Sequence, residues 1–63
     1  LICVDHYDRI LVADRDSDII QIFSKYGDFI SNVGQDFLNR PQGVAVDSNG
    51  RIFVTDYHRL SVF

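Results

Sequence analysis

The chain has 63 residues and a formal net charge of −3, with 46% apolar and 24% charged residues. This composition is typical of a folded globular chain and excludes a disordered one. Its apolar runs are far shorter than the roughly 20 residues of a membrane helix, so no membrane contact is expected. The acidic balance argues against a wholly basic nucleic-acid-binding domain, although a local basic patch remains compatible with it.

Short runs of β-branched and aromatic residues, separated by polar turns, predict β-strands along the whole chain. No segment keeps the apolar spacing of a helix over two turns. Pro41 cannot donate a hydrogen bond to a strand partner, so its neighbourhood is predicted to be a connection. The Asn49-Gly50 pair predicts a hairpin turn, because both residues tolerate positive φ. The predicted strands are Ile2–Asp5, Arg9–Ala13, Ile19–Phe23, Phe29–Val33, Val44–Asp47, Arg51–Thr55 and Leu60–Phe63.

An internal repeat predicts how these strands are arranged. The sequence of residues 2–14 returns at residues 44–56, a shift of 42 positions, with six identities in 13 aligned positions. A four-stranded propeller blade recurs at roughly this spacing. The sequence therefore predicts an all-β fold, namely a β-propeller fragment with one four-stranded antiparallel blade and three strands of the next. The predicted bounds are 1–33 for the first blade, 34–43 for the connection and 44–63 for the incomplete second blade.

Apolar residues on both faces of the strands fit blades that stack face to face. In the second predicted strand, Ile10 lies on one face and Leu11 on the other, because side chains alternate along a strand. Since the chain begins at Leu1 rather than Met and its last strand ends at Phe63, we expect a fragment of a longer array, completed by the remaining blades of the same propeller. The residues expected to pack between blades are Phe23, Phe29, Phe53, Val62 and Phe63.

The repeat carries the motif of a known family. Residues 40–47 read RPQGVAVD, residues 50–56 read GRIFVTD and residues 60–63 read LSVF. This combination resembles the NHL-repeat β-propellers and is most similar to the C-terminal NHL domain of tripartite-motif proteins. The resemblance implies a non-catalytic binding module for protein and/or RNA partners, the target-recognition part of an E3 ubiquitin ligase whose RING domain is absent here. The alternatives are an interaction scaffold without ligase activity and a fragment of a secreted NHL-type lyase.

Two features depart from the family pattern. Asp14 and Phe23 are nine positions apart, whereas their equivalents Asp56 and Phe63 are seven apart, which indicates a shortened hairpin or a sequence gap in the second copy. Ile19 stands where the family commonly has arginine, which reduces the basic character of that turn.

A binding surface is predicted where the connection meets the turn between the second and third strands of each blade, because these segments share one face of a propeller. Exposed rings there could stack on the bases of single-stranded or stem-loop RNA, and arginines could contact phosphates. Asp16 and Asp18 oppose RNA by adding negative charge, so protein and RNA partners both stay open. The candidate binding residues are Arg15, Arg40, Gln42, Tyr57, His58 and Arg59.

Catalytic, metal and cofactor sites are not predicted. Residues 14–18 read DRDSD, which opens like a calcium loop, but Ile19 and Lys25 replace the required glycine and glutamate. The serines, His6 and His58 lie in no nucleophile motif, and Cys3 fits a small buried apolar residue. A free cysteine and the lack of an N-glycosylation sequon favour a cytoplasmic location. The four aspartates expected to close turns by accepting N–H groups are Asp5, Asp14, Asp47 and Asp56.

Overall fold

The computed structural model describes residues 1–63 and contains seven β-strands. Each predicted strand is present, and its bounds differ from the predicted ones by at most one residue at either end. The structure contains no helix that is long and apolar enough to cross a membrane. The strands are β1 (Ile2–Val4), β2 (Ile10–Asp14), β3 (Ile19–Phe23), β4 (Phe29–Val33), β5 (Gly43–Val46), β6 (Ile52–Thr55) and β7 (Leu60–Val62).

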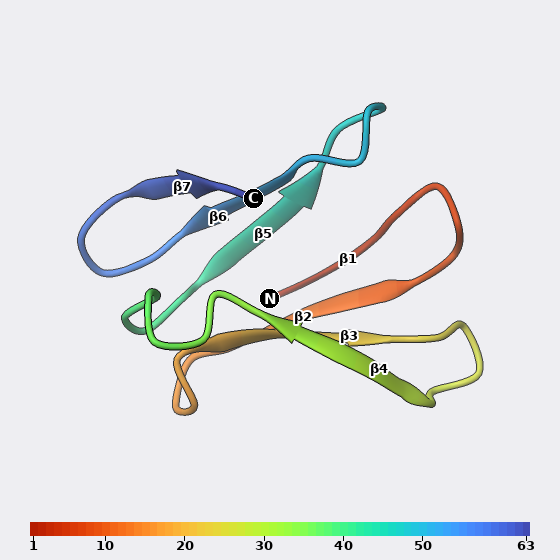
Figure 1. The fold of residues 1–63 in the computed structure, drawn as a ribbon, viewed down its shortest axis with the longest axis horizontal. Coiled ribbons are helices and arrows are strands. Elements are labelled where there is room, and N and C mark those ends of the chain that lie inside the picture. Colours follow the sequence, from red (N-terminus) through yellow and green to blue (C-terminus); the bar gives the residue numbers. More distant parts are fainter.

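The strands form two separate antiparallel sheets, ordered β1-β2-β3-β4 and β5-β6-β7 (Figure 1). The same register occurs in both: Val4 pairs with Ile10 in the first sheet, and Val46 pairs with Ile52 in the second. Strand β5 packs across β1 and β2, so the second sheet lies against the first. The predicted all-β class, with two blade-like sheets of a β-propeller, is therefore confirmed.

The core lies between the two sheets and is built from opposite faces of the repeat. From the first sheet, Leu11 and Ile20 face the interface and are 1% and 0% exposed. From the second sheet, Val54 faces them and is 0% exposed. Shifted by 42 positions, Val54 corresponds to Val12, the neighbour of Leu11 that points to the other side of its sheet. One copy therefore covers the other by presenting the opposite set of alternate residues.

The outer faces of the pair remain apolar and exposed. On β1, Ile2 and Val4 are 64% and 61% exposed, although their repeat equivalents in β5 pack against the core. The aromatic residues expected between the sheets lie elsewhere: Phe29 is 58% exposed, and Phe53 pairs with Val62, which is 53% exposed, on the outer face of the second sheet. Phe53 and Val62 do not line the interface between the two sheets of this chain, because alternation places them on the face opposite Val54.

The second hairpin of each copy differs in length, as the sequence predicted. Ala13 pairs with Ile20 in the first copy, whereas the equivalent Thr55 pairs with Leu60 in the second. The turn after β6 is thus shorter by two residues, yet the register is restored at once. Phe63 exchanges two backbone hydrogen bonds of 2.9 and 2.8 Å with Ile52.

The connection between the sheets is held close to the core. Gly34 begins it with φ of 83°, and its carbonyl accepts hydrogen bonds from the N–H groups of Phe37 and Leu38. A side chain at Gly34 would overlap that of Leu38, which is 5% exposed and belongs to the core. Pro41 is also buried, as expected for a residue that has no N–H to satisfy.

Candidate functional site

Three segments that are far apart in sequence meet at one end of the two sheets. These are the β2–β3 turn (15–18), the connection (34–42) and the β6–β7 turn (56–59), all on the left side of Figure 1. The other three turns lie at the opposite end. We call the first group the connection edge. The arrangement brings the six predicted binding residues to one end of the fold. No hydrogen bond joins Arg15, Arg40 or Gln42 to the other three residues, which lie in the β6–β7 turn.

Asn39 fastens the connection to the β6–β7 turn. Its backbone N–H donates to Asp56 Oδ2 at 2.9 Å, and its carbonyl accepts from the N–H of Tyr57 at 2.8 Å. Its side-chain amide lies 3.1 Å from Nε2 of His58. Asn39, which contacts the predicted binding residues Tyr57 and His58, is thus a structural link that sequence reasoning missed. The Asn39-Arg40-Pro41 motif gives no local signal for this role.

Asp56 closes the β6–β7 turn, as predicted. Besides the Asn39 N–H, its carboxylate accepts the N–H groups of His58 and Arg59, each at 2.9 Å. The hydrogen bond from Asn39 is the strongest influence on this carboxyl group and lowers its pKa; partial burial opposes the shift without cancelling it. Asp56 therefore stays ionised and is occupied with local backbone groups rather than available to a ligand.

Arg59 is engaged with the connection as well. Its Nη2 donates to the carbonyl of Phe37 at 2.6 Å, and its guanidinium lies 4.3 Å from the centroid of the Phe37 ring. The same ring meets the ring of Phe63 edge-on at 5.8 Å. Arg59 thus holds the connection against the second sheet, and only its remaining exposed surface is open to a partner.

The other predicted residues are more open. Arg40 has φ of 53°, and its backbone N–H donates to Asp18 Oδ1 at 2.8 Å, which ties the connection to the β2–β3 turn of the first sheet. Its side chain is exposed, as are those of Arg15 and Gln42. Tyr57 is 69% exposed, and its ring meets that of His58 edge-on at 5.0 Å.

The charge of the connection edge is mixed rather than basic. Its three arginines, at 15, 40 and 59, face four aspartates, at 16, 18, 36 and 56. Two of the aspartates, Asp18 and Asp36, adopt positive φ values of 60° and 65°. Short side chains that can hydrogen-bond locally tolerate this conformation better than other non-glycine residues.

A cleft of about 450 Å³ opens in this edge between the β2–β3 turn, the end of β4 and the start of the connection. Its lining includes two carboxylates and no cation. The lining residues are Ser17, Asp18, Ile19, Asn32, Gln35, Asp36 and Leu38.

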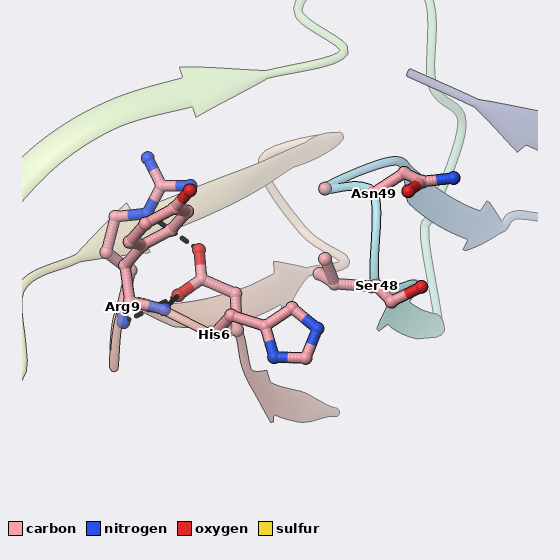
Figure 2. A pocket seen from close by; sticks show the side chains of 8 residues that line it. His6, Arg9, Ser48 and Asn49 are labelled. Carbon is pink, nitrogen blue, oxygen red and sulfur yellow. Dashed lines mark hydrogen bonds and ion pairs between the residues drawn. The ribbon is translucent and has the colours of Figure 1, made fainter.

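A second, smaller cleft of about 120 Å³ lies at the opposite end, between the β1–β2 and β5–β6 turns. Figure 2 shows His6 and Arg9 on one wall and Ser48 and Asn49 on the other, with the side chains of Ser48 and Asn49 directed away from Arg9. The second wall is therefore largely turn backbone, which leaves few groups aimed at a ligand.

Both of these turns are closed by an aspartate and an arginine four residues later. Asp5 Oδ2 accepts from Arg9 Nε at 2.7 Å, and Asp47 Oδ2 accepts from Arg51 Nε at the same distance. Burial is the largest influence and raises the pKa of both carboxyl groups, but their hydrogen bonds and the arginine charge outweigh it, so each pKa lies below its ordinary value. The structural role predicted for these two aspartates is confirmed.

The comparisons with known proteins agree with this architecture. Residues 38–63 match the family model of the NHL repeat. This stretch of the chain is therefore similar to an NHL repeat. It is 46% identical over 59% of its length to the B-box type zinc finger protein ncl-1 of Caenorhabditis elegans, and 42% identical over 75% to the protein brain tumor of Drosophila melanogaster. It is also 57% identical over 48% of its length to the protein lin-41 of C. elegans.

These matches confirm the resemblance to NHL proteins of the tripartite-motif class, over short stretches. The chain spans 4%, 5% and 3% of the lengths of these three relatives. Within the NHL repeat, the motif residues have structural tasks: Pro41 is buried, the N–H of Gln42 donates to the carbonyl of Thr55 at 2.9 Å, and Asp47 closes a turn.

The possible reactive groups of the chain are its histidines, its serines and Cys3. His6 and Ser48 line the same small cleft, but no hydrogen bond joins them. Burial, followed by the nearby charge of Asp5, raises the pKa of the Cys3 thiol, which disfavours a reactive thiolate. No three histidine, cysteine or acidic side chains are grouped so that they could hold a metal ion. Sequence reasoning was wrong on Asp14, which pairs with Ile19 as the last residue of β2 and accepts no turn N–H group, because its longer turn leaves it within the ladder.

Proposed function

We propose that this NHL chain is part of a non-catalytic binding module whose partner docks on the connection edge. The observation that carries the proposal is the fastening of three sequence-distant segments by Asn39, Asp18 and Arg59. Loops held in this way lose little conformational freedom when a partner binds, so more of the contact energy appears as affinity. Exposed Tyr57, Arg15 and Arg40 supply the aromatic and cationic contacts that often dominate binding interfaces.

The charge of the edge favours a polypeptide as the partner. Four aspartates stand among three arginines, and two of the aspartates line the larger cleft. A nucleic-acid site of comparable size usually presents a basic surface, because phosphate contacts supply most of its affinity. A protein partner can instead match both signs of charge.

RNA is the second candidate, and the ring pair of Tyr57 and His58 favours it. Tyr57 is 69% exposed and leaves room for a base to stack on it. Single-stranded or stem-loop RNA is then the appropriate ligand, since unpaired bases can reach such rings. Arg15 would contribute a phosphate contact.

A matched pair of double variants tests the proposal in the full-length protein. Tyr57→Ala with Arg15→Ala removes a ring and a cation from the connection edge, whereas Tyr26→Ala with Lys25→Ala removes the same types from the opposite end. Partners are identified by proximity labelling, and RNA binding is measured by fluorescence anisotropy with a randomised single strand and a stem-loop. We expect the first variant alone to lose about tenfold in partner recovery or affinity. Equal losses in both variants, or none in the first, would contradict the proposal.

The resemblance extends the proposal to the longer protein. There, this module would select the target of an E3 ubiquitin ligase in the cytoplasm, while the RING domain would transfer ubiquitin. Ubiquitination of a recovered partner by the purified full-length protein tests this extension. A protein that binds its partner but does not ubiquitinate it would be an interaction scaffold.

A further inference from the structure

The larger cleft combines a charged rim with an apolar floor. Asp18 and Asp36 supply two carboxylates, while Ile19 is half-buried and Leu38 is 5% exposed. Oδ1 of Asp18 accepts the N–H of Arg40, which leaves its second oxygen without a partner in the chain, and no hydrogen bond engages the carboxylate of Asp36. A long side chain with an aliphatic stem and a cationic end matches both parts of such a cleft.

The volume of the cleft suits this kind of occupant. About 450 Å³ corresponds to roughly 15 water molecules at about 30 Å³ each, which is enough for one arginine or lysine side chain and some surrounding solvent. Amide and hydroxyl oxygens of Asn32, Gln35 and Ser17 complete the rim and can accept further N–H bonds from a guanidinium. The lining contains no cation that would repel it.

An independent feature beside the cleft points to an extended polypeptide. Strand β4 is the outer edge of its sheet and contributes Asn32 to the cleft. Its sequence, FISNV, contains no charged residue and no proline. A β-bulge leaves Ile30 without a partner on β3, whereas residues 31–33, beside the cleft, keep regular pairing. Natural edge strands are commonly protected by charges, prolines, shortness or β-bulges, because their free N–H and C=O groups accept another strand, so the regular stretch 31–33 is the part of this edge that is open to one. An added strand bonds through its backbone and gains specificity from side-chain pockets.

We propose that the cleft formed by the β2–β3 turn, the end of β4 and the connection binds an arginine or lysine side chain of a partner polypeptide that lies extended along the free edge of β4. This inference rests on the proposed function, since it names the class of partner for the same edge. The cationic end pairs with Asp18 and Asp36, and the aliphatic stem covers Ile19 and Leu38.

Isosteric variants test the charge without disturbing the fold. Asp18→Asn keeps an oxygen to accept the Arg40 N–H, and asparagine tolerates the positive φ of both positions. Asp36→Asn is the second variant. Asp16→Asn is the matched control, because Asp16 belongs to the same turn but does not line the cleft. The probe is a synthetic peptide of alternating valine and threonine with a central arginine, compared with the same peptide carrying neutral citrulline.

Fluorescence anisotropy with the full-length protein gives the readout. We expect the arginine peptide to bind about tenfold more tightly than the citrulline peptide, as for hydrogen bonds to charged groups. Asp18→Asn or Asp36→Asn should abolish this preference, while Asp16→Asn should keep it. Equal binding of both peptides to the unaltered protein, or equal losses in all three variants, would overturn the proposal. If Asp18→Asn and Asp36→Asn retain the partner that the double variant Tyr57→Ala with Arg15→Ala loses, the proposed function stands and only this inference fails.

Discussion

The β1–β2 hairpin and the β5–β6 hairpin end in turns of the same construction, set in different surroundings. In each, the aspartate Oδ2 meets the arginine Nε at 2.7 Å, and the aspartate N–H donates to the arginine carbonyl at 3.0 Å. The side chain of Asp5 is only 4% exposed, whereas that of Asp47 is 24% exposed. The third turn residue has positive φ in both, but it is Asp8 in the first and Gly50 in the second. The local sequence therefore dictates the turn, and the surroundings dictate how much the turn contributes to stability.

The same contrast applies to the strands behind these turns. Val12 and Val54 occupy equivalent positions of the repeat, but only Val54 lies between the sheets, with 0% exposure. These equivalent residues thus have equivalent strand partners but unequal burial.

The largest expected effect comes from truncating this valine pair. Val54→Ala should lower the free energy of unfolding by about 2 kcal/mol, because it removes two buried carbon atoms and leaves a cavity. Val12→Ala, the identical change at the equivalent position, should cost clearly less. Urea-induced unfolding of the chain measures both, and equal losses would mean that Val12 is covered as fully as Val54.

An intermediate effect is expected from acid and from Asp5→Asn. The carboxyl groups of Asp5 and Asp47 each have a lower pKa in the folded chain than in the unfolded one. Their ionised forms therefore stabilise the fold fully above the unfolded pKa of about 4, and this stabilisation is lost as the pH falls through the folded pKa. At neutral pH, Asp5→Asn should cost about 1 to 2 kcal/mol. Asp47→Asn should cost less, because solvent screens its ion pair. A melting temperature recorded from neutral pH to pH 2 should fall for the unaltered chain and converge with that of Asp5→Asn. A melting temperature that rises in acid would refute this sign.

The smallest effect comes from exchanging the third turn residues. Asp8→Gly should stabilise the first turn by up to about 1 kcal/mol, because glycine adopts positive φ without a steric penalty. Gly50→Asp should destabilise the second turn by a similar amount, and no side-chain clash adds to it, since no atom lies within 4 Å of a Cβ placed there. Thermal melts of both variants provide the measurement, and shifts of the same sign would show that the two turns are not equivalent.

Much of this fold could be predicted from the sequence, because strand length, alternation and the repeat are local signals. The structure confirmed the seven strands, the two sheets and the shortened turn after β6. The hairpin turn at Asn49-Gly50 and the positive φ of Gly50 were predicted as well, whereas the hydrogen bonds of Asp47, which set a three-residue loop, were not specified by that pair.

The candidate site could be predicted only in part. Propeller geometry placed the six candidate residues at one end, but long-range hydrogen bonds decide which of them are free. Arg59 bonds to Phe37, 22 positions away, and the Asn39 N–H bonds to Asp56, 17 positions away. No local spacing encodes such pairs. The acidic cleft was likewise missed, because its lining comes from three segments that become neighbours only when β4 turns into the connection.

The use of opposite faces by successive copies has a consequence for how this chain can change during evolution. Duplicating a whole 42-residue unit adds a sheet whose two faces already match those of its neighbours, so repeat number can grow without new interface chemistry. Inserting a single residue in β6 before Val54 has the opposite result. Because side chains alternate along a strand, the insertion would turn Val54 away from the interface between the sheets and move Thr55 to the opposite face. Gains and losses of length should therefore accumulate in the turns, as the two residues missing after β6 already illustrate.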